Sequence, residues 1–185
     1  IRPVRQRAAG RVAATDAGVH TLVFQSRHSY IELPAKKFEH YLVEEGLEHI
    51  VRLRRRMGKT GRPGRESYFR NCKSLLRVGS STQGFDRRVG LPFEITALTN
   101  PFRGGMVELV VERHGRPAAG VKVDLIALDG LRVAAEAVSD QRGRIRVRIP
   151  RGSWMLAATD MRRAPRGVRG DWESAWTSLT FESTR

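Results

Sequence analysis

The sequence has one cysteine, Cys72, among its 185 residues. An intrachain disulfide needs two, so none can form, and cysteine usage is silent on the redox state of the compartment. No apolar run approaches the roughly 20 residues that cross a bilayer. The chain also begins at Ile1, without Met and without the apolar segment of a signal peptide. We therefore interpret it as a processed or incomplete chain with no membrane-spanning helix.

Aromatic residues make up only 7% of the chain, and 19 acidic residues face 34 Lys and Arg, a formal net charge of +15. A surplus of this size must be solvated or neutralised by an acidic partner. The basic residues are dispersed among acids, and few rings are available for base stacking, so we expect no nucleic-acid partner. The charge favours a protein partner with an acidic surface, or anionic lipid head groups.

Catalytic motifs are also missing. The loop Gly58 to Gly64 contains GKT, but a phosphate-binding loop needs a glycine where Leu53 stands. Cys72 has no base nearby in the sequence, and the serines lack a nucleophile-elbow motif. We expect a protein that is not an enzyme, although a triad can assemble from distant residues.

Metal-ligand spacing is weak as well. Five histidines occur, but no two stand four apart on one expected helix or two apart on one expected strand. His40 and His49 would nearly align on an unbroken helix, which Gly46 interrupts. We therefore predict no metal ligands and no cofactor from the residues themselves.

The C-terminal half is rich in short strands separated by turns that contain Gly, Asn or Asp. Seven such strands at about ten-residue spacing predict an antiparallel β-sandwich of immunoglobulin-like type over residues 92–183. The expected strands are Phe93–Ala97, Met106–Arg113, Val121–Ala127, Arg132–Val138, Arg144–Ile149, Ser153–Thr159 and Ala175–Phe181. The predicted fold class is therefore mainly β.

The N-terminal half is divided differently. Residues 1–33 include β-forming stretches that we interpret as the last strands of an incomplete N-terminal β domain. Residues 34–79 form a helical connecting segment, with apolar residues at helical spacing on both sides of a break at Gly46. Within it, Glu66 to Val78 fits a helix or a strand. Residues 80–91 are expected to be a flexible linker.

The strand Arg144–Ile149 alternates arginine with apolar residues. Arg144, Arg146 and Arg148 are expected to project from one face about 7 Å apart. They could bind phosphates, carboxylates or an acidic partner. Alternatively, they are charges that protect an exposed edge strand from aggregation.

A second basic group, Arg52, Arg55 and Arg56, is expected on one face of a helix. It is either a partner-binding or anion-binding surface or a solvated face near a helix C-terminus.

Two of the three tryptophans, Trp172 and Trp176, stand four residues apart. On a short helical turn they would stack on one side and present an aromatic surface to a partner. Alternatively, they cover the open end of the sandwich core.

Several segments together resemble the DUF4198 family over about residues 17 to 182. The stretches that resemble it are SYIELPAKKF at 29–38, YLVEEGL at 41–47, GRPGRE at 61–66, CKSL at 72–75, DWES at 171–174 and SLTFE at 178–182. In addition, GRPAAGV at 115–121 and SDQRGR at 139–144 resemble a carboxypeptidase-regulatory or prealbumin-like sandwich.

The resemblance to DUF4198 implies a secreted, usually periplasmic protein with two β domains joined by a helical segment, associated with nickel and cobalt uptake. The first β domain is almost entirely missing here, and the histidines present match no family ligand motif.

The sequence thus predicts a noncatalytic periplasmic binding or scaffolding module, peripheral to a membrane and docking on a protein partner as an accessory subunit. The alternative is an accessory protein for nickel or cobalt uptake. A third hypothesis, an enzyme acting on a small anion, would need a concave pocket beside Arg144, Arg146 and Arg148.

Overall fold

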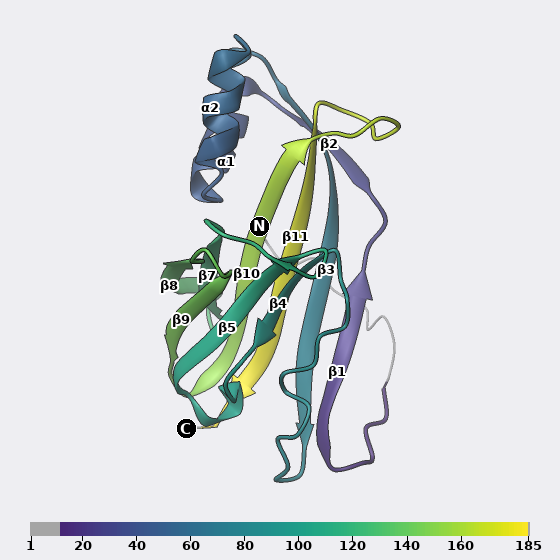
Figure 1. Ribbon diagram of the computed structural model, residues 1–185, viewed down its shortest axis with the longest axis vertical. Coiled ribbons are helices and arrows are strands. Elements are labelled where there is room, and N and C mark those ends of the chain that lie inside the picture. The colour runs from purple at the N-terminus through teal and green to yellow at the C-terminus, as the bar shows by residue number, and fades with distance from the viewer. Residues whose placement is uncertain (1–11, 185) are drawn as a thin grey trace.

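The computed structural model describes residues 12–184, so the first eleven residues of the expected N-terminal segment 1–33 lie outside the described part. The fold is mainly β, as predicted, with two α-helices and one 3-10 helix (Figure 1). The elements before residue 80 are β1 Gly18–Gln25, β2 Ser29–Leu33, α1 Ala35–Glu44, α2 Glu48–Arg56 and β3 Gly64–Val78. Those after it are β4 Phe93–Ala97, η1 Pro101–Arg103, β5 Gly105–Arg113, β6 Arg116–Pro117, β7 Lys122–Ala127, β8 Arg132–Val138, β9 Arg144–Ile149, β10 Gly152–Arg163 and β11 Trp172–Ser183.

The larger sheet has seven strands in the order β1-β3-β11-β10-β7-β8, with β2 paired to the N-terminal part of β3. The smaller sheet has four strands, in which β5 pairs with β4, β6 and β9. All pairings are antiparallel except β3 with β11, which is parallel over nine residue pairs from Glu66↔Trp172 to Ser74↔Thr180. The larger sheet is therefore mixed, not purely antiparallel as predicted for residues 92–183. The parallel strand is β3, which precedes residue 80 and was not among the predicted strands of the sandwich.

The main core lies between the two sheets. Leu156 and Ala158 of β10 and Leu179 and Phe181 of β11 pack against the small sheet in one cluster of buried residues. These residues stand two apart on each strand, so they share one face of the large sheet. Leu75 of β3 belongs to the same cluster. The strand before residue 80 and the strands after it thus bury a common core.

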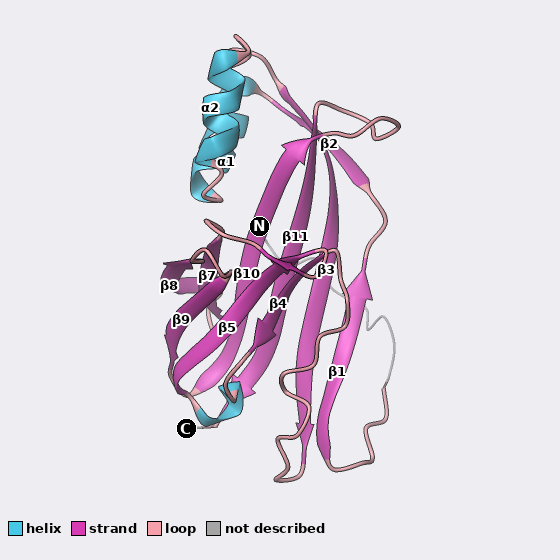
Figure 2. Ribbon diagram, viewed as in Figure 1, coloured by secondary structure: helices cyan, strands magenta, loops and turns pink. Residues whose placement is uncertain are grey.

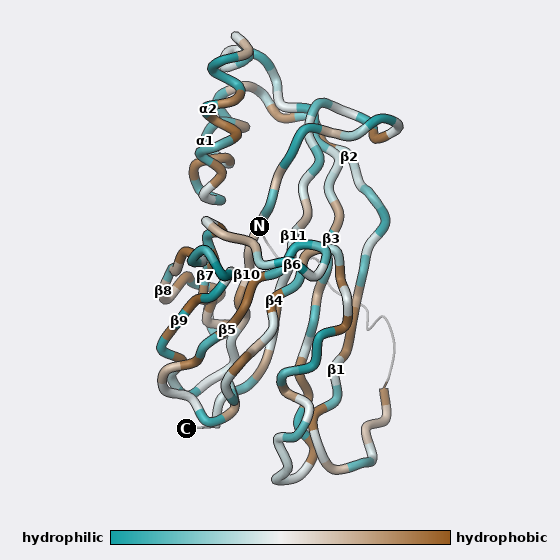
Figure 3. Tube along the Cα trace, in the orientation of Figure 1, coloured by the Kyte–Doolittle hydropathy of each residue, from teal (hydrophilic) through white to brown (hydrophobic). Residues whose placement is uncertain are grey.

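The helices cover the opposite face of the large sheet. Met161 on β10 and Trp172 on β11 are separated by an odd number of positions from the core residues of the same strands, so they point to the other face of the sheet. They pack with Phe38, Leu42 and Ile50 of the helices in a second cluster. Figure 2 shows the helical pair at one end of the long strands, and Figure 3 shows apolar and polar residues interspersed along both helices. No helix within residues 12–184 is long and apolar enough to cross a membrane.

The predicted helical segment 34–79 is helical only as far as Arg56 and needs correction beyond it. Residues 64–78 form the strand β3, in which Glu66 and Ser67 are both buried. Helices cover one face of this stretch and Glu66 belongs to that face, whereas Ser67 points the other way. A strand buried on both faces loses the polar-apolar alternation that identifies strands in sequence, which explains the ambiguous pattern.

Residues 80–91, the expected linker, have no regular secondary structure but are tied to the sheets. The backbone N–H groups of Val89, Gly90 and Leu91 donate to the Glu94 carboxylate at 2.9 to 3.0 Å. Lys73 of β3 donates to the same carboxylate at 2.7 Å and to the Arg87 carbonyl at 3.2 Å. A buried ion pair therefore joins β3, the segment 80–91 and β4.

Candidate functional site

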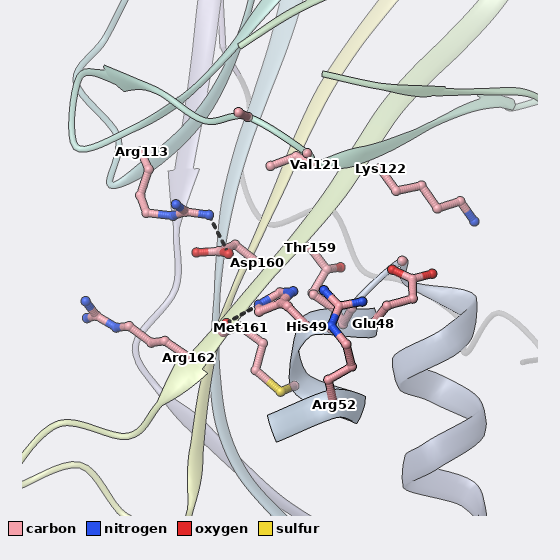
Figure 4. A pocket seen from close by; sticks show the side chains of 14 residues that line it. Glu48, His49, Arg52, Arg113, Val121, Lys122, Thr159, Asp160, Met161 and Arg162 are labelled. Atoms are coloured by element: carbon pink, nitrogen blue, oxygen red, sulfur yellow. Dashed lines mark hydrogen bonds and ion pairs between the residues drawn. The ribbon is translucent and has the colours of Figure 1, made fainter. Parts of the chain in front are cut away.

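A cleft of about 740 Å³ lies between the start of α2, the loop before β7 and the far end of β10 (Figure 4). We call it the basic cleft. Its charged lining residues are four cations and two carboxylates: Arg52, Arg113, Lys122, Arg162, Glu48 and Asp160. His49 and Thr159 add an imidazole and a hydroxyl group. The lining alone thus has two more cations than carboxylates, so a negatively charged ligand is favoured where a cation is not already paired with a carboxylate.

Two arginines of the cleft are held by neighbouring carboxylates. Arg113, at the end of β5, pairs with Asp160 of β10 at 2.5 Å, and its Nε is buried without a partner among the described residues. Arg162 pairs with Glu173 through two nitrogens, at 2.8 and 2.6 Å. Both guanidinium groups are therefore fixed in place, and part of their charge is already neutralised.

Lys122, at the start of β7, connects the cleft to the helices. Its ammonium donates to the Glu44 carbonyl at 2.8 Å and pairs with Glu136 at 2.9 Å and Asp124 at 3.2 Å. Burial disfavours the charged ammonium, but these carboxylates outweigh it and raise the pKa of Lys122. The lysine stays protonated at any physiological pH.

Arg52 differs from the other cations because its side chain forms no ion pair or hydrogen bond with a described residue. It is exposed on α2, as are Arg55 and Arg56, which stand three and four residues further along the same helix face. Neither Arg55 nor Arg56 lines the cleft. The three unpaired guanidinium groups form a basic ridge that begins at the cleft, as their spacing predicted.

The helices are anchored beside the cleft by polar contacts with β10. His49 Nε2 lies 3.1 Å from the Met161 carbonyl oxygen, and the Thr159 hydroxyl donates to Glu45 at 2.6 Å. Burial raises the pKa of the Glu45 carboxyl. Sequence reasoning missed these contacts because they join residues more than 110 positions apart.

Arg54, which the sequence did not single out, is the arginine of α2 that is buried. It pairs with Glu39 of α1 at 2.6 Å and donates to the carbonyls of Lys59 and Arg62 at 2.9 and 2.8 Å. Its guanidinium also lies 4.8 Å from the centre of the Phe38 ring. Arg54 therefore ties the helical pair to the glycine-rich loop and is structural.

A second, smaller cleft of about 230 Å³ lies on the helix side of the large sheet and is lined mainly by apolar and aromatic residues. Its floor is Glu66, a buried carboxyl that accepts hydrogen bonds from the hydroxyls of Tyr41, at 3.2 Å, and Ser174. Burial raises the pKa of Glu66, and these hydroxyls offset only part of the shift. Burial without a cation nearby disfavours the charged form of this carboxyl.

The predicted tryptophan pair lies on a strand, not on a helical turn. Trp172 and Trp176 belong to β11, whose side chains repeat every two residues, so they still share a face. Trp172 is fully buried under the helices. Trp176 stacks on Tyr41 with ring centres 6.0 Å apart and lines the smaller cleft. Only Trp176 is placed to meet a ligand.

The arginine row on β9 forms as predicted, with Arg144, Arg146 and Arg148 exposed and the intervening residues buried. A hollow of about 500 Å³ lies beside Arg144 and Arg146. However, Glu108 of β5 pairs with Arg144 at 2.9 Å and approaches Arg146 at 3.8 Å. The row lies in the small sheet and does not join the basic cleft or Trp176.

The nickel or cobalt alternative requires a cluster of metal-ligating side chains. No group of three or more His, Cys, Asp or Glu side chains within residues 12–184 is arranged to hold a metal ion. His28 instead bonds to Glu173 at 3.0 Å and His49 to the Met161 carbonyl. The nickel or cobalt alternative therefore has no such ligand cluster in this part of the chain.

The fold defines a two-sheet β-sandwich protein with a helical pair on the outer face of its larger sheet. The chain belongs to the family described as Domain of unknown function (DUF4198), whose sequence model matches residues 4–162. The resemblance to DUF4198 is thus confirmed over residues 4–162, so the resembling stretches at 171–174 and 178–182 lie beyond the match. The likeness of residues 115–121 and 139–144 to a prealbumin-like sandwich stays a prediction. No curated protein and no solved structure matches the chain.

Proposed function

We propose that this protein is a noncatalytic binding module that holds an acidic segment of a protein partner in the basic cleft, as an accessory subunit of a larger, membrane-associated assembly. The main support is Arg52, an exposed cation without an ion pair at the mouth of a cleft whose lining has four cations and two carboxylates. An unpaired guanidinium can form charge-assisted, two-pronged hydrogen bonds with an incoming carboxylate.

The basic ridge supports the same proposal. Arg55 and Arg56 extend the positive surface beyond Arg52, so a partner longer than the cleft would still meet cations outside it. Charges of this kind accelerate association and select acidic partners more than they add affinity. Anionic lipid head groups could meet the ridge, but a flat membrane surface does not enter a cleft.

The arginine row on β9 is the competing surface. Arg146 is 76% exposed, yet Glu108 lies between it and Arg144 and offsets their charge. The basic cleft is therefore favoured over the row. A periplasmic location follows from the family resemblance alone and stays a prediction.

The test uses a fluorescent hexaglutamate peptide and the full 185-residue chain. Binding is measured by fluorescence anisotropy at low and at raised salt, because charge-driven binding between exposed groups weakens with ionic strength. Arg52→Glu is expected to weaken binding at least fivefold.

Two charge-matched variants serve as controls. Arg151→Glu changes an exposed residue just before β10, at the opposite end of that strand from the cleft, and should bind like the parent. Arg146→Glu reports on the β9 row. If Arg146→Glu weakens binding and Arg52→Glu does not, the row is the binding surface and the proposed cleft is wrong.

A further inference from the structure

The strand β10 continues beyond one of its two neighbours. It pairs with β11 over its whole length, from Gly152↔Ser183 to Arg163↔Trp172. Its pairing with β7 ends at Ala158↔Val123. Residues 159–163 therefore have a paired strand on one edge and, among the described residues, none on the other.

The basic cleft lies along this open edge. Four consecutive residues of β10 line it, from Thr159 to Arg162. Neighbouring side chains of a strand point to opposite faces of a sheet, so a cleft that touches four in a row lies beside the strand and meets its backbone. Figure 4 shows these residues together with His49 and Arg52 from the helix opposite.

One backbone group on this edge already has a side-chain partner. His49 Nε2 lies 3.1 Å from the Met161 carbonyl oxygen. Along a strand, residues two apart direct their backbone groups to the same side, so Thr159 and Arg163 face the same way as Met161. Sheet edges left open in this manner pair readily with another chain unless they are covered. Here the helices pack beside the edge, but the described hydrogen bond to its backbone comes from the His49 imidazole.

The charge around the edge limits which chain can enter. Arg113 and Arg162 flank β10, and Lys122 and Arg52 stand across the cleft. An extended segment of five residues spans about 17 Å at roughly 3.3 Å per residue, which matches the open stretch 159–163. Acidic side chains on such a segment would meet Arg52 without first breaking an ion pair.

We infer that the acidic partner segment binds as an added β-strand along residues 159–163 of β10, an inference that rests on the proposed function. Main-chain hydrogen bonds then supply affinity, and the surrounding cations select acidic side chains, as in other complexes formed by strand addition. His49 would give up its bond to Met161 when the segment enters.

The test compares three hexaglutamate peptides with the full chain by fluorescence anisotropy: unmodified, N-methylated at every second amide, and N-methylated at every amide. The half-methylated peptide keeps one edge able to form hydrogen bonds, whereas the fully methylated peptide has none but keeps its charges. Strand addition predicts that the half-methylated peptide binds within threefold of the unmodified one. The fully methylated peptide should bind at least tenfold more weakly.

The outcomes separate the inference from the function beneath it. If all three peptides bind equally and Arg52→Glu weakens each of them, the acidic cleft stands and strand addition is overturned. Equal loss with both methylated peptides also overturns it, because one free edge should suffice. If unmodified hexaglutamate does not bind, or binds Arg52→Glu as well as the parent, the proposed function fails and strand addition fails with it.

Discussion

Three buried ionisable side chains stand out at the scale of single residues. Arg54 and Lys73 each have a carboxylate partner, at 2.6 and 2.7 Å. Glu66 is 2% exposed and is held by hydroxyl groups, with no ion pair to a described residue. No cation therefore offsets the cost of burying its negative charge. Of the three residues, Glu66 is the one whose protonation should most clearly change the free energy of unfolding.

Replacing Glu66 with Gln should reduce the pH dependence of stability. Burial raises the folded-state pKa of Glu66 above its ordinary value of 4.5. The stabilisation from this group is therefore complete below the unfolded-state pKa and is lost as pH rises through the folded-state pKa. Urea denaturation from pH 4.5 upward should show a smaller decline in the free energy of unfolding for Glu66→Gln than for the parent, with the variant at least as stable at pH 8.

The matched control is Glu32→Gln, which changes an exposed carboxyl on β2. It should leave the pH dependence as it is in the parent. A parallel decline in Glu66→Gln and the parent would mean that folding does not raise the pKa of Glu66, contrary to the burial argument.

At the scale of elements, the docking of α1 depends on a glycine. Gly64 begins β3, and a Cβ atom added there would overlap the ring of Phe38 on α1. Phe38 is fully buried, so the ring has no free space to move into. We expect Gly64→Ala to lower the free energy of unfolding by about 1–3 kcal/mol, the usual cost of overpacking a core.

Chemical denaturation followed by circular dichroism measures this change. Gly61→Ala is the control, since a Cβ at Gly61 meets no atom within 4 Å. Equal stability of both variants would show that α1 is not packed on β3 as described.

The same elements show which parts of the fold can be predicted from sequence. The strand β9 was predicted residue for residue, because its apolar side chains are buried and its arginines exposed in strict alternation. The strand β3 was ambiguous because Glu66 and Ser67 are both buried. Its parallel pairing with β11 joins residues 106 positions apart, and a pairing over such a distance leaves no pattern in the local sequence.

The candidate site was predictable only in part for the same reason. Arg52 was found as one of three basic residues on a helix face. Its cleft is formed by α2, the loop before β7 and β10, which are distant in the sequence. No local sequence pattern therefore identified Asp160 or His49 as residues of the site. Trp172 was expected on a helical turn, but a spacing of four residues places two side chains on the same face of a strand as well as of a helix. It was expected to meet a partner, but it is buried under the helices.

At the scale of the whole molecule, the two halves of the sequence depend on each other. β11 pairs with β3 over nine residue pairs, and the buried Lys73–Glu94 ion pair joins β3 to β4. We therefore expect a fragment of residues 92–184 to lack a stable fold. It would expose one edge of β11 and leave Glu94 without its buried cation, a loss of about 3–5 kcal/mol where one partner is removed.

The two-dimensional ¹H–¹⁵N spectrum of this fragment should be poorly dispersed, and its thermal unfolding should lack a cooperative transition. The full chain, recorded under the same conditions, gives the reference. A well-dispersed spectrum from the fragment would show that the C-terminal sandwich is an independent domain, as the sequence alone suggested.

The position of β11 also has a consequence for how the protein is made. β11 is the strand nearest the C-terminus among residues 12–184, yet it lies between β3 and β10 in the middle of the large sheet. While the ribosome is still adding residues 172–183, β1 with β3 and β10 with β7 can form only as separate halves. The large sheet becomes continuous when β11 pairs with both β3 and β10, so we expect it to be complete only after residue 183 has been synthesised.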